Sequence, residues 1–365
     1  MRILVTGFTA NYGGVEAFLM NYYRAMKKLD STVVIDIIST AKEPAFKDEL
    51  IQMGGQVHLI SRAREKSKVK KELSHIMNEN KYDVLWCNKC DLSDITYLEE
   101  AYKNKIPKRI LHSHNSDNLY TGMRSKIVKI MHDLNKKKAM KCATEYWACS
   151  DYAANWMFNK DTKYTFVPNA VNAEKLRFNN EKREQYRADL GLKDKLVVGC
   201  VARISFQKNP EFIVDIFNEI HKSNENSVLL WAGTGELQEQ IETKIKEYNI
   251  EKSVVFLGMR QDVSNLMQAM DCLLLPSRFE GLPVVAIEAQ SAGLQVFASS
   301  EGISKQTKIT ESLKFLSLSQ TAKQWTDEIL KTDLTHKDTT EQIIKSGFEI
   351  NSAAQNSLKK LGEIK

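Results

Sequence analysis

Two glutamates stand in the stretch RFEGLPVVAIEAQSAG, which runs from Arg278 to Gly293. Glu280 precedes the triplet Gly281, Leu282 and Pro283, and Glu288 lies in the apolar, helix-like segment that follows, of which Pro283 is expected to be the first residue. A carboxylate is costly to place against apolar neighbours unless it has a partner. A helical side chain leans toward the start of its helix, so Glu288 is expected to point toward the loop that holds Glu280. The pattern favours two ligand-binding acids, with Glu288 suited to the vicinal hydroxyls of a ribose, over a cap and a solvated helix face.

Two cations occupy a second loop, in the segment VARISFQKNPEF. Arg203 and Lys208 follow an apolar run, and Asn209 and Pro210 fit the N-cap and the first position of a helix. A helix N-terminus favours anions, and arginine can bind a phosphate through two hydrogen bonds. The loop therefore predicts a diphosphate site. Basic loop residues are common, so the two cations alone would be weak evidence for it.

The first half of the chain adds glycines and histidines at the ends of strand-like runs. Gly13 and Gly14 in GFTANYGGVEAFL would let the backbone approach a ligand. His112 and His114 end RILHSHN and share one face of that strand, and a histidine there could donate a hydrogen bond or transfer a proton. We favour His114 because it stands at the strand's end. The glycines of LLWAGTGEL, Gly233 and Gly235, are interpreted as a tight turn.

The elements that must position these residues alternate between short β-branched runs and helix-like stretches over most of the chain. This order predicts an α/β protein of two doubly wound, Rossmann-like domains, with ligands bound where the carboxyl ends of the strands face a cleft. The polar stretch 179–195 separates the two series. We expect an N-terminal domain at 1–172, a C-terminal domain at 173–344, and a final helix at about 345–365 that packs back on the first domain.

Composition excludes several classes of protein. The longest apolar runs fall short of the roughly 20 residues that span a bilayer, and MRILVTGF lacks the features of a signal peptide. A cytoplasmic protein with reduced cysteines is expected. CNKC, with Cys87 and Cys90, has metal-ligand spacing but no second pair, so buried thiols are the better interpretation.

The first domain has an excess of basic residues, since residues 1–172 contain 27 Lys and Arg and 19 Asp and Glu. Such an excess suits solvated faces, a phosphate-bearing acceptor or an anionic membrane surface. The aromatic-interleaved basic motifs of nucleic-acid binders are absent, so we expect no nucleic-acid partner.

Taken in order, these motifs resemble those of the retaining, family-four glycosyltransferases with the GT-B fold. The matching segments are YGG, HSH, ACS, VPNAVN, VARISFQKNP, WAGTGEL, FLGMRQDVSNLMQAMDCLLLPS and the two glutamates, and they cover nearly the whole chain. The likeness is greatest to bacterial enzymes of capsular and exopolysaccharide assembly. It implies transfer of a hexose-type sugar from a nucleotide-diphosphate sugar, with UDP as the expected nucleotide, to a lipid-linked saccharide at the inner face of the membrane.

The resemblance also implies a role for each residue. Arg203 and Lys208 would hold the diphosphate, Glu288 the ribose and Glu280 the sugar hydroxyls. The backbone of Gly281, Leu282 and Pro283 would lie against sugar and phosphate, Gly13 and Gly14 would close on the donor, and His114 would lie near sugar and acceptor. Ala170, Asn172, Ala202 and Gln295 depart from residues common in the family, which affects local geometry and removes no charged group.

The chain contains no Asp-x-Asp motif, so we expect no metal and no cofactor, with the two cations supplying positive charge. Two alternatives stay open. A nucleotide-sugar epimerase or other NAD-dependent enzyme would fit ILVTGFTANYGG, although Ala10 replaces a glycine of the fingerprint and the Tyr-x-x-x-Lys from Tyr23 to Lys27 comes very early. The second alternative is a non-catalytic GT-B partner subunit. The complete set of acidic and basic site residues, Glu280, Glu288, Arg203 and Lys208, argues against it.

Overall fold

The structure, a computed structural model, describes residues 1–61 and 65–363. The chain forms two compact units, unit 1 being Met1–Ala170 with Gly347–Lys365 and unit 2 being Val171–Ser346. The division after Ala170 lies two residues before the expected one, and residues 345–346 belong to unit 2. The helix expected at about 345–365 is α15, Ile350–Gly362, and the last two residues of that prediction lie outside the described part.

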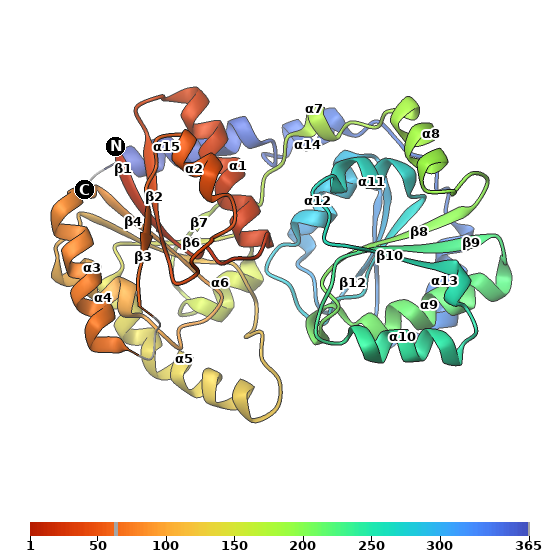
Figure 1. Ribbon diagram of the computed structural model, residues 1–365, viewed down its shortest axis with the longest axis horizontal. Helices are drawn as coiled ribbons and strands as arrows, with labels where there is room; N and C mark the ends of the chain where they lie inside the picture. Colours follow the sequence, from red (N-terminus) through yellow and green to blue (C-terminus); the bar gives the residue numbers. More distant parts are fainter. Residues whose placement is uncertain (62–64, 364–365) are drawn as a thin grey trace. The chain divides into compact units, whose positions relative to one another are not determined.

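Unit 1 is built on a parallel sheet in the order β3-β2-β1-β4-β5-β6-β7 (Figure 1). Its strands are β1 Arg2–Thr6, β2 Val34–Ser39, β3 Val57–Leu59, β4 Val84–Lys89, β5 Lys108–Ser113, β6 Glu145–Ala148 and β7 Thr165–Phe166. Its helices are α1 Gly14–Leu29, α2 Lys47–Gln52, α3 Lys66–Asn80, α4 Thr96–Lys103, α5 Gly122–Cys142, α6 Asp151–Met157 and α15.

One core of unit 1 lies between the sheet and the helices α1 and α15. Phe18, Tyr22 and Met26 recur at helical spacing in α1 and are buried against β-strand residues such as Trp86. Ala354 and Leu361 of α15 complete the same core. The end of the chain is therefore part of the first unit's interior.

Unit 2 has a second parallel sheet, in the order β10-β9-β8-β11-β12-β13. Its strands are β8 Leu196–Val201, β9 Ser227–Ala232, β10 Val254–Gly258, β11 Cys272–Leu275, β12 Gln295–Ser299 and β13 Leu313–Leu316. Its α-helices are α7 Ala173–Leu176, α8 Asn180–Asp189, α9 Pro210–Ser223, α10 Gln238–Glu247, α11 Val263–Ala269, α12 Val284–Ser291, α13 Ala322–Lys331 and α14 Thr340–Lys345. Three 3₁₀ turns lie at Phe206–Lys208, Glu251–Ser253 and Lys305–Thr307.

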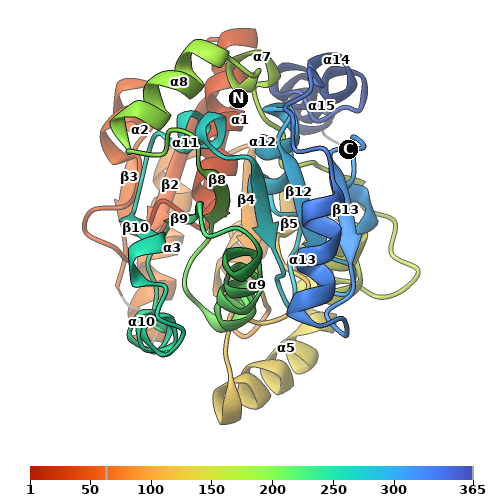
Figure 2. The ribbon, with the colours of Figure 1, turned by 90° about the vertical axis from the view of Figure 1, so that its right-hand side faces the viewer.

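Both faces of this sheet are covered, α9 and α13 lying on one face and α11 and α12 on the other (Figure 2). Alternate residues of β8 follow the two faces. Val198 and Cys200 join the core beneath α9, and Val197 joins the core beneath α12. This is the doubly wound architecture that the alternation of strand and helix predicts.

Candidate functional site

The loops after β8 and β11 flank the point at which the strand order of unit 2 reverses. β8 pairs with β9 on one side and with β11 on the other, so the connections from these strands leave to opposite faces. A crevice at the carboxyl ends of the strands is the usual ligand site of such sheets. Arg203 and Lys208 lie in the first loop and Glu280 in the second, so the sheet brings the predicted cations and acid to this edge.

Glu280 is the centre of a buried polar cluster, only 8% of its side chain being exposed. Its Oε1 pairs with Lys208 Nζ and accepts a hydrogen bond from Ser277 Oγ at 2.8 Å. Its Oε2 accepts from Gln207 Nε2 at 3.3 Å. The carboxylate is therefore held by three side chains from the two loops, and it is partnered rather than capping a helix.

The Glu280 loop rests on the segment that follows β12. Gly302 accepts a hydrogen bond from the Glu280 amide at 2.7 Å, and Ser299 Oγ donates to the Ser277 carbonyl. A Cβ at Gly302 would come within 2.1 Å of the Ser277 carbonyl oxygen, so only glycine permits this approach.

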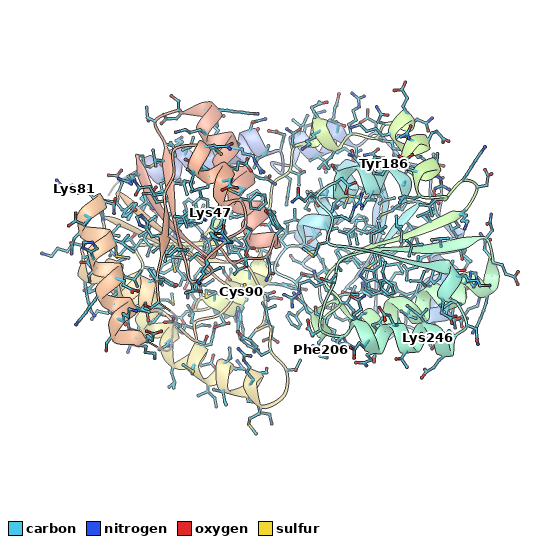
Figure 3. The ribbon with its side chains drawn as sticks, in the orientation of Figure 1. Lys47, Lys81, Cys90, Tyr186, Phe206 and Lys246 are labelled. Atoms are coloured by element: carbon cyan, nitrogen blue, oxygen red, sulfur yellow. The ribbon has the colours of Figure 1, made fainter. Side chains whose placement is uncertain are left out.

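The loop that carries Lys208 is tied directly to the Glu280 loop. The Arg278 amide donates to the Gln207 carbonyl at 2.8 Å, and the Arg278 guanidinium donates to the Phe206 carbonyl at 2.6 Å. The same guanidinium lies 4.3 Å from the centre of the Phe206 ring. Figure 3 marks the position of Phe206. These contacts fix Lys208 and Glu280 relative to each other.

Arg203 takes a different place from Lys208. Its side chain is 62% exposed and contacts Glu236 at 3.6 Å, which is a weak surface pair. Asn209 stands at the N-cap position of α9, with Pro210 first in the helix as predicted, but its side chain makes no capping bond. Its φ of 56° instead turns the chain from the 3₁₀ turn into α9.

Gly233 and Gly235 support the backbone on either side of Arg203. A Cβ at Gly233 would lie 2.1 Å from the Ala202 carbonyl oxygen, and one at Gly235 would lie 2.2 Å from that of Ile204. The φ of Gly233 is 139°, which other residues rarely adopt. The tight turn expected at this motif therefore packs directly against the backbone of Ala202 and Ile204, which flank Arg203.

Gly235→Ala is expected to destabilise unit 2 by about 1–3 kcal/mol, because the added methyl must displace the Ile204 backbone. Urea unfolding measures the loss. Gly362→Ala in α15 is the control, since a Cβ there meets nothing within 4 Å and alanine favours a helix. Equal stability of the Gly235→Ala variant and the native protein would contradict the close approach.

Glu288 is the fifth residue of α12 and is only partly exposed. Its carboxyl has no hydrogen bond or ion pair within the described residues, and burial raises its pKa to about 7. Pro283 is the N-cap of α12 with extended ψ of 112°, so the prediction that it begins the helix was wrong by one residue. Gly281 and Leu282 lie between Glu280 and α12, and Leu282 is buried.

In unit 1, Gly13 is the N-cap of α1 and Gly14 is its first residue. A Cβ at Gly13 would come within 2.7 Å of Glu16 Oε2, whereas one at Gly14 would meet nothing within 4 Å. Glu16 is buried and accepts hydrogen bonds from the amide and the hydroxyl of Thr9, at 3.1 and 2.6 Å. The start of α1 therefore already holds a carboxylate of its own chain beside Gly13.

The two histidines lie with ring centres 4.0 Å apart, beside Phe18 of α1. β5 ends at Ser113, one residue before His114. His112 is fully buried, and its Nδ1 accepts from Trp86 Nε1 at 3.1 Å. Its Nε2 has no partner among the described residues, and burial lowers its pKa well below the usual range. His112 is thus a core residue.

Asn88 determines which nitrogen of His114 carries the proton. Asn88 Nδ2 donates to the carbonyls of Thr6 and Trp86 at 2.9 and 3.1 Å, so its Oδ1 is the atom 2.7 Å from His114 Nε2. His114 Nε2 must donate, which leaves Nδ1 as an acceptor. Burial lowers the pKa of His114 to about 3, so the ring is neutral. His114 Nε2 is thus already used by Asn88, and Nδ1 is the ring nitrogen that could accept a hydrogen bond from a ligand hydroxyl.

The CNKC cysteines lie at the end of β4, where Cys87 is buried and Cys90 follows the strand (Figure 3). Burial raises the pKa of both thiols, that of Cys90 to about 12. No group of three or more potential metal-binding side chains was found among residues 1–61 and 65–363.

Several residues of the site were missed by sequence reasoning. Ser277 and Gln207 hold Glu280, Gly302 supports its loop, and Asn88 orients His114. Ser277 could have been identified from the sequence, because it ends the run DCLLLPS three residues before Glu280. Gly302 and Asn88 carry no local signal, since Gly302 is 22 residues from Glu280 and Asn88 is 26 residues from His114 in the chain.

Comparison with known proteins gives a family for the second half of the chain. Residues 182–348 match the model of the family described as glycosyl transferases group 1. The chain is 26% identical over 366 residues to EpsF of Bacillus subtilis, a protein named as a glycosyltransferase, covering 98% of this chain and 94% of EpsF. It is 29% identical over 188 residues to the Escherichia coli UDP-Gal:alpha-D-GlcNAc-diphosphoundecaprenol alpha-1,3-galactosyltransferase, covering 49% of each.

Solved structures share the fold along the whole chain. Anabaena HepE, in a crystal structure with UDP and glucose, superposes with a TM-score of 0.80 at 17% identity, covering 99% of each chain. Sucrose-phosphate synthase of Thermosynechococcus elongatus superposes with a TM-score of 0.75 at 15% identity, covering 99% and 98%. The fold is therefore GT-B, as the resemblance implied.

Proposed function

We propose that the protein is a glycosyltransferase of bacterial polysaccharide assembly, which transfers a hexose-type sugar from a nucleotide-diphosphate sugar to a lipid-linked saccharide with retention of configuration. The match of residues 182–348 to the glycosyl transferases group 1 model supports this proposal, as does the glycosyltransferase name of EpsF, which aligns with 98% of this chain. The NAD-dependent alternative receives no support from these relatives. The E. coli relative is named for a diphosphoundecaprenol-linked acceptor, which supports the proposed acceptor class.

The observation that carries the proposal is the pairing of Lys208 with Glu280 at the strand-order reversal of unit 2. Lys208 is held in place by the buried acid Glu280 without the need for a ligand, and Arg203, earlier in the same loop, adds an exposed charge. Together they suit a diphosphate whose negative charge grows as the bond to the sugar breaks. Glu288 has no hydrogen bond or ion pair among residues 1–61 and 65–363, which suits a carboxylate that receives the ribose hydroxyls.

The proposed reaction needs no protein nucleophile and no metal. The bond from the anomeric carbon to the diphosphate oxygen breaks, and the acceptor oxygen forms the new bond on the same face of the sugar. The proton of the acceptor hydroxyl passes to the departing phosphate oxygen, and the nucleoside diphosphate leaves. Arg203 and Lys208 stabilise that oxygen, and Glu280 orients the sugar through its hydroxyls.

In unit 1, His114 Nδ1 would accept a hydrogen bond from a sugar or acceptor hydroxyl, with Gly13 and Gly14 allowing close approach of the backbone. Because burial lowers the pKa of this neutral imidazole to about 3, it is a weak general base at neutral pH, which favours a proton route through phosphate.

A thermal-shift panel of nucleotide sugars tests the donor. The correct donor should stabilise the protein by about 2.7 kcal/mol at a hundred times its dissociation constant, because it binds only the folded state. UDP-linked hexoses are expected to give the largest shifts, and the same sugars without nucleotide should give none. A panel with NAD and NADH included, in which those cofactors alone stabilise the protein, would refute the proposal.

A further inference from the structure

The inner face of α5 is fixed firmly to unit 1. His132 is fully buried, stacks on Trp156 with ring centres 4.0 Å apart, and accepts a hydrogen bond from the Leu92 amide at 3.1 Å. Asn135 donates to the Leu92 carbonyl at 2.8 Å. Val128 and Ala139, on the same face, are buried. The helix is therefore held along most of its length, and its orientation is set.

Helix α5 lies at the periphery of unit 1 (Figure 1). Its outer face carries large apolar side chains that are exposed to solvent. These five residues, which we call the apolar stripe, are Met123 (71% exposed), Ile127 (52%), Ile130 (60%), Met131 (38%) and Leu134 (75%). Spacings of three and four residues place them on one side of the helix, opposite the buried face.

Elsewhere the exposed large hydrophobic residues among the described residues are scattered over many elements. Scattered apolar residues are normal on soluble proteins, whereas a contiguous patch marks an interaction surface. Five such residues in one 21-residue helix are therefore a distinct feature of α5.

The charge of α5 is strongly positive. The helix has seven Lys and Arg and a single acid, Asp133, which pairs with Lys129 at 3.4 Å. Lys138 pairs with Glu99 of α4. Lys126, Lys137 and Lys141 are exposed and have no ion pair within the described residues. At helical spacing these three border the apolar stripe.

We propose that α5 lies in the surface of an anionic phospholipid bilayer, with the apolar stripe among the acyl chains and Lys126, Lys137 and Lys141 against the headgroup phosphates. An amphipathic helix with lysines beside its apolar face binds in the plane of the interface. No described helix is long and apolar enough to cross a membrane. The inference deepens the proposed action on a lipid-linked acceptor, and it needs no particular donor or sugar.

A second copy of the chain is a poorer occupant of this surface. Two α5 helices face to face would bring together two helices of net charge +6 with few acids to offset them, and like charges oppose such docking. Anionic lipid supplies the opposite charge and an apolar phase together.

Flotation with vesicles tests the proposal. The native protein should float with phosphatidylcholine vesicles that contain phosphatidylglycerol and remain unbound with phosphatidylcholine alone. Ile130→Gln/Leu134→Gln should lower the bound fraction at limiting lipid on the order of tenfold, because two inserted side chains become polar. Ile51→Gln/Leu59→Gln, at two comparably exposed positions of unit 1, is the matched control and should bind like the native protein.

A charge variant separates the two contributions. Lys126→Gln/Lys137→Gln/Lys141→Gln should weaken binding to phosphatidylglycerol vesicles and reduce its dependence on salt. Equal flotation of the stripe variant and the control, or no flotation of the native protein, would overturn the proposal. So would a native dimer in lipid-free solution that the stripe variant converts to a monomer.

Stabilisation by the donor found in the thermal-shift panel should be unchanged in all these variants, which shows that they are folded. That measurement also keeps the two proposals apart. Donor binding without vesicle binding refutes the role of α5 alone, and vesicle binding without any donor refutes the proposed reaction alone.

Discussion

Lys208→Ala should lower the rate of sugar transfer on the order of a hundredfold and also destabilise the protein. The rate falls because about 3 kcal/mol of stabilisation of the departing phosphate is lost. Stability falls because Glu280, 8% exposed, is left as a buried carboxylate without its cation, which costs about 3–5 kcal/mol. Steady-state transfer with a saturating donor and urea unfolding measure the two effects.

The double variant Lys208→Ala/Glu280→Gln distinguishes the structural role of the pair from its role toward phosphate. The neutral amide keeps an acceptor for Ser277 Oγ and removes the unpaired charge, so most of the lost stability should return. The transfer rate should stay low, as should that of Glu280→Gln alone. The double-mutant cycle gives the interaction free energy between Lys208 and Glu280. If the double variant regained the native rate, Lys208 would be a structural partner only.

Glu288→Gln should raise stability above neutral pH and leave it unchanged in acid. Burial raises the pKa of Glu288 from 4.5 to about 7, so the folded state holds a proton that the unfolded state releases between these values. Native stability therefore falls as pH rises through that window. The glutamine variant lacks this loss and should be more stable at pH above 7 by roughly 2–3 kcal/mol. Urea unfolding across the pH range measures the difference.

The same titration should appear in donor binding. If ionised Glu288 accepts the ribose hydroxyls, donor affinity should fall with pH below about 7, toward tenfold per pH unit. The diphosphate diester of a nucleotide sugar stays ionised over this range, so it adds no slope. Glu288→Gln should bind more weakly and with a flat profile. If donor affinity depended on pH in the same way in the native protein and in Glu288→Gln, Glu288 would not be the ribose ligand.

Much of the fold could be predicted because buried parallel strands are continuous apolar runs. β8, β9 and β11 stand out in this way, and the alternation with helices gave the doubly wound class. β13 does not stand out in the sequence, because LKFL is four residues long and contains a lysine among serines. Pro283 was misplaced because an extended proline before a helix and a proline that begins it have the same sequence context.

The site was predictable as a set of residue types and unpredictable as a set of contacts. Glu280 and Lys208 could be selected because their types and loops suit a diphosphate sugar. Their direct pairing depends on two loops 72 residues apart in the chain, which local sequence does not specify. The tautomer of His114 depends on Asn88, whose amide is oriented by carbonyls of β1 and β4. Tertiary packing decides these details.

The contribution of α15 to the interior of unit 1 has a consequence for synthesis on the ribosome. Chains emerge from the amino end, and domains generally fold as units as they appear. Unit 2 is complete once Ser346 is exposed, whereas unit 1 still lacks Ile350, Ala354 and Leu361 of its core. The unit that is translated first is therefore finished last, because the part of its core that α15 covers stays uncovered until then.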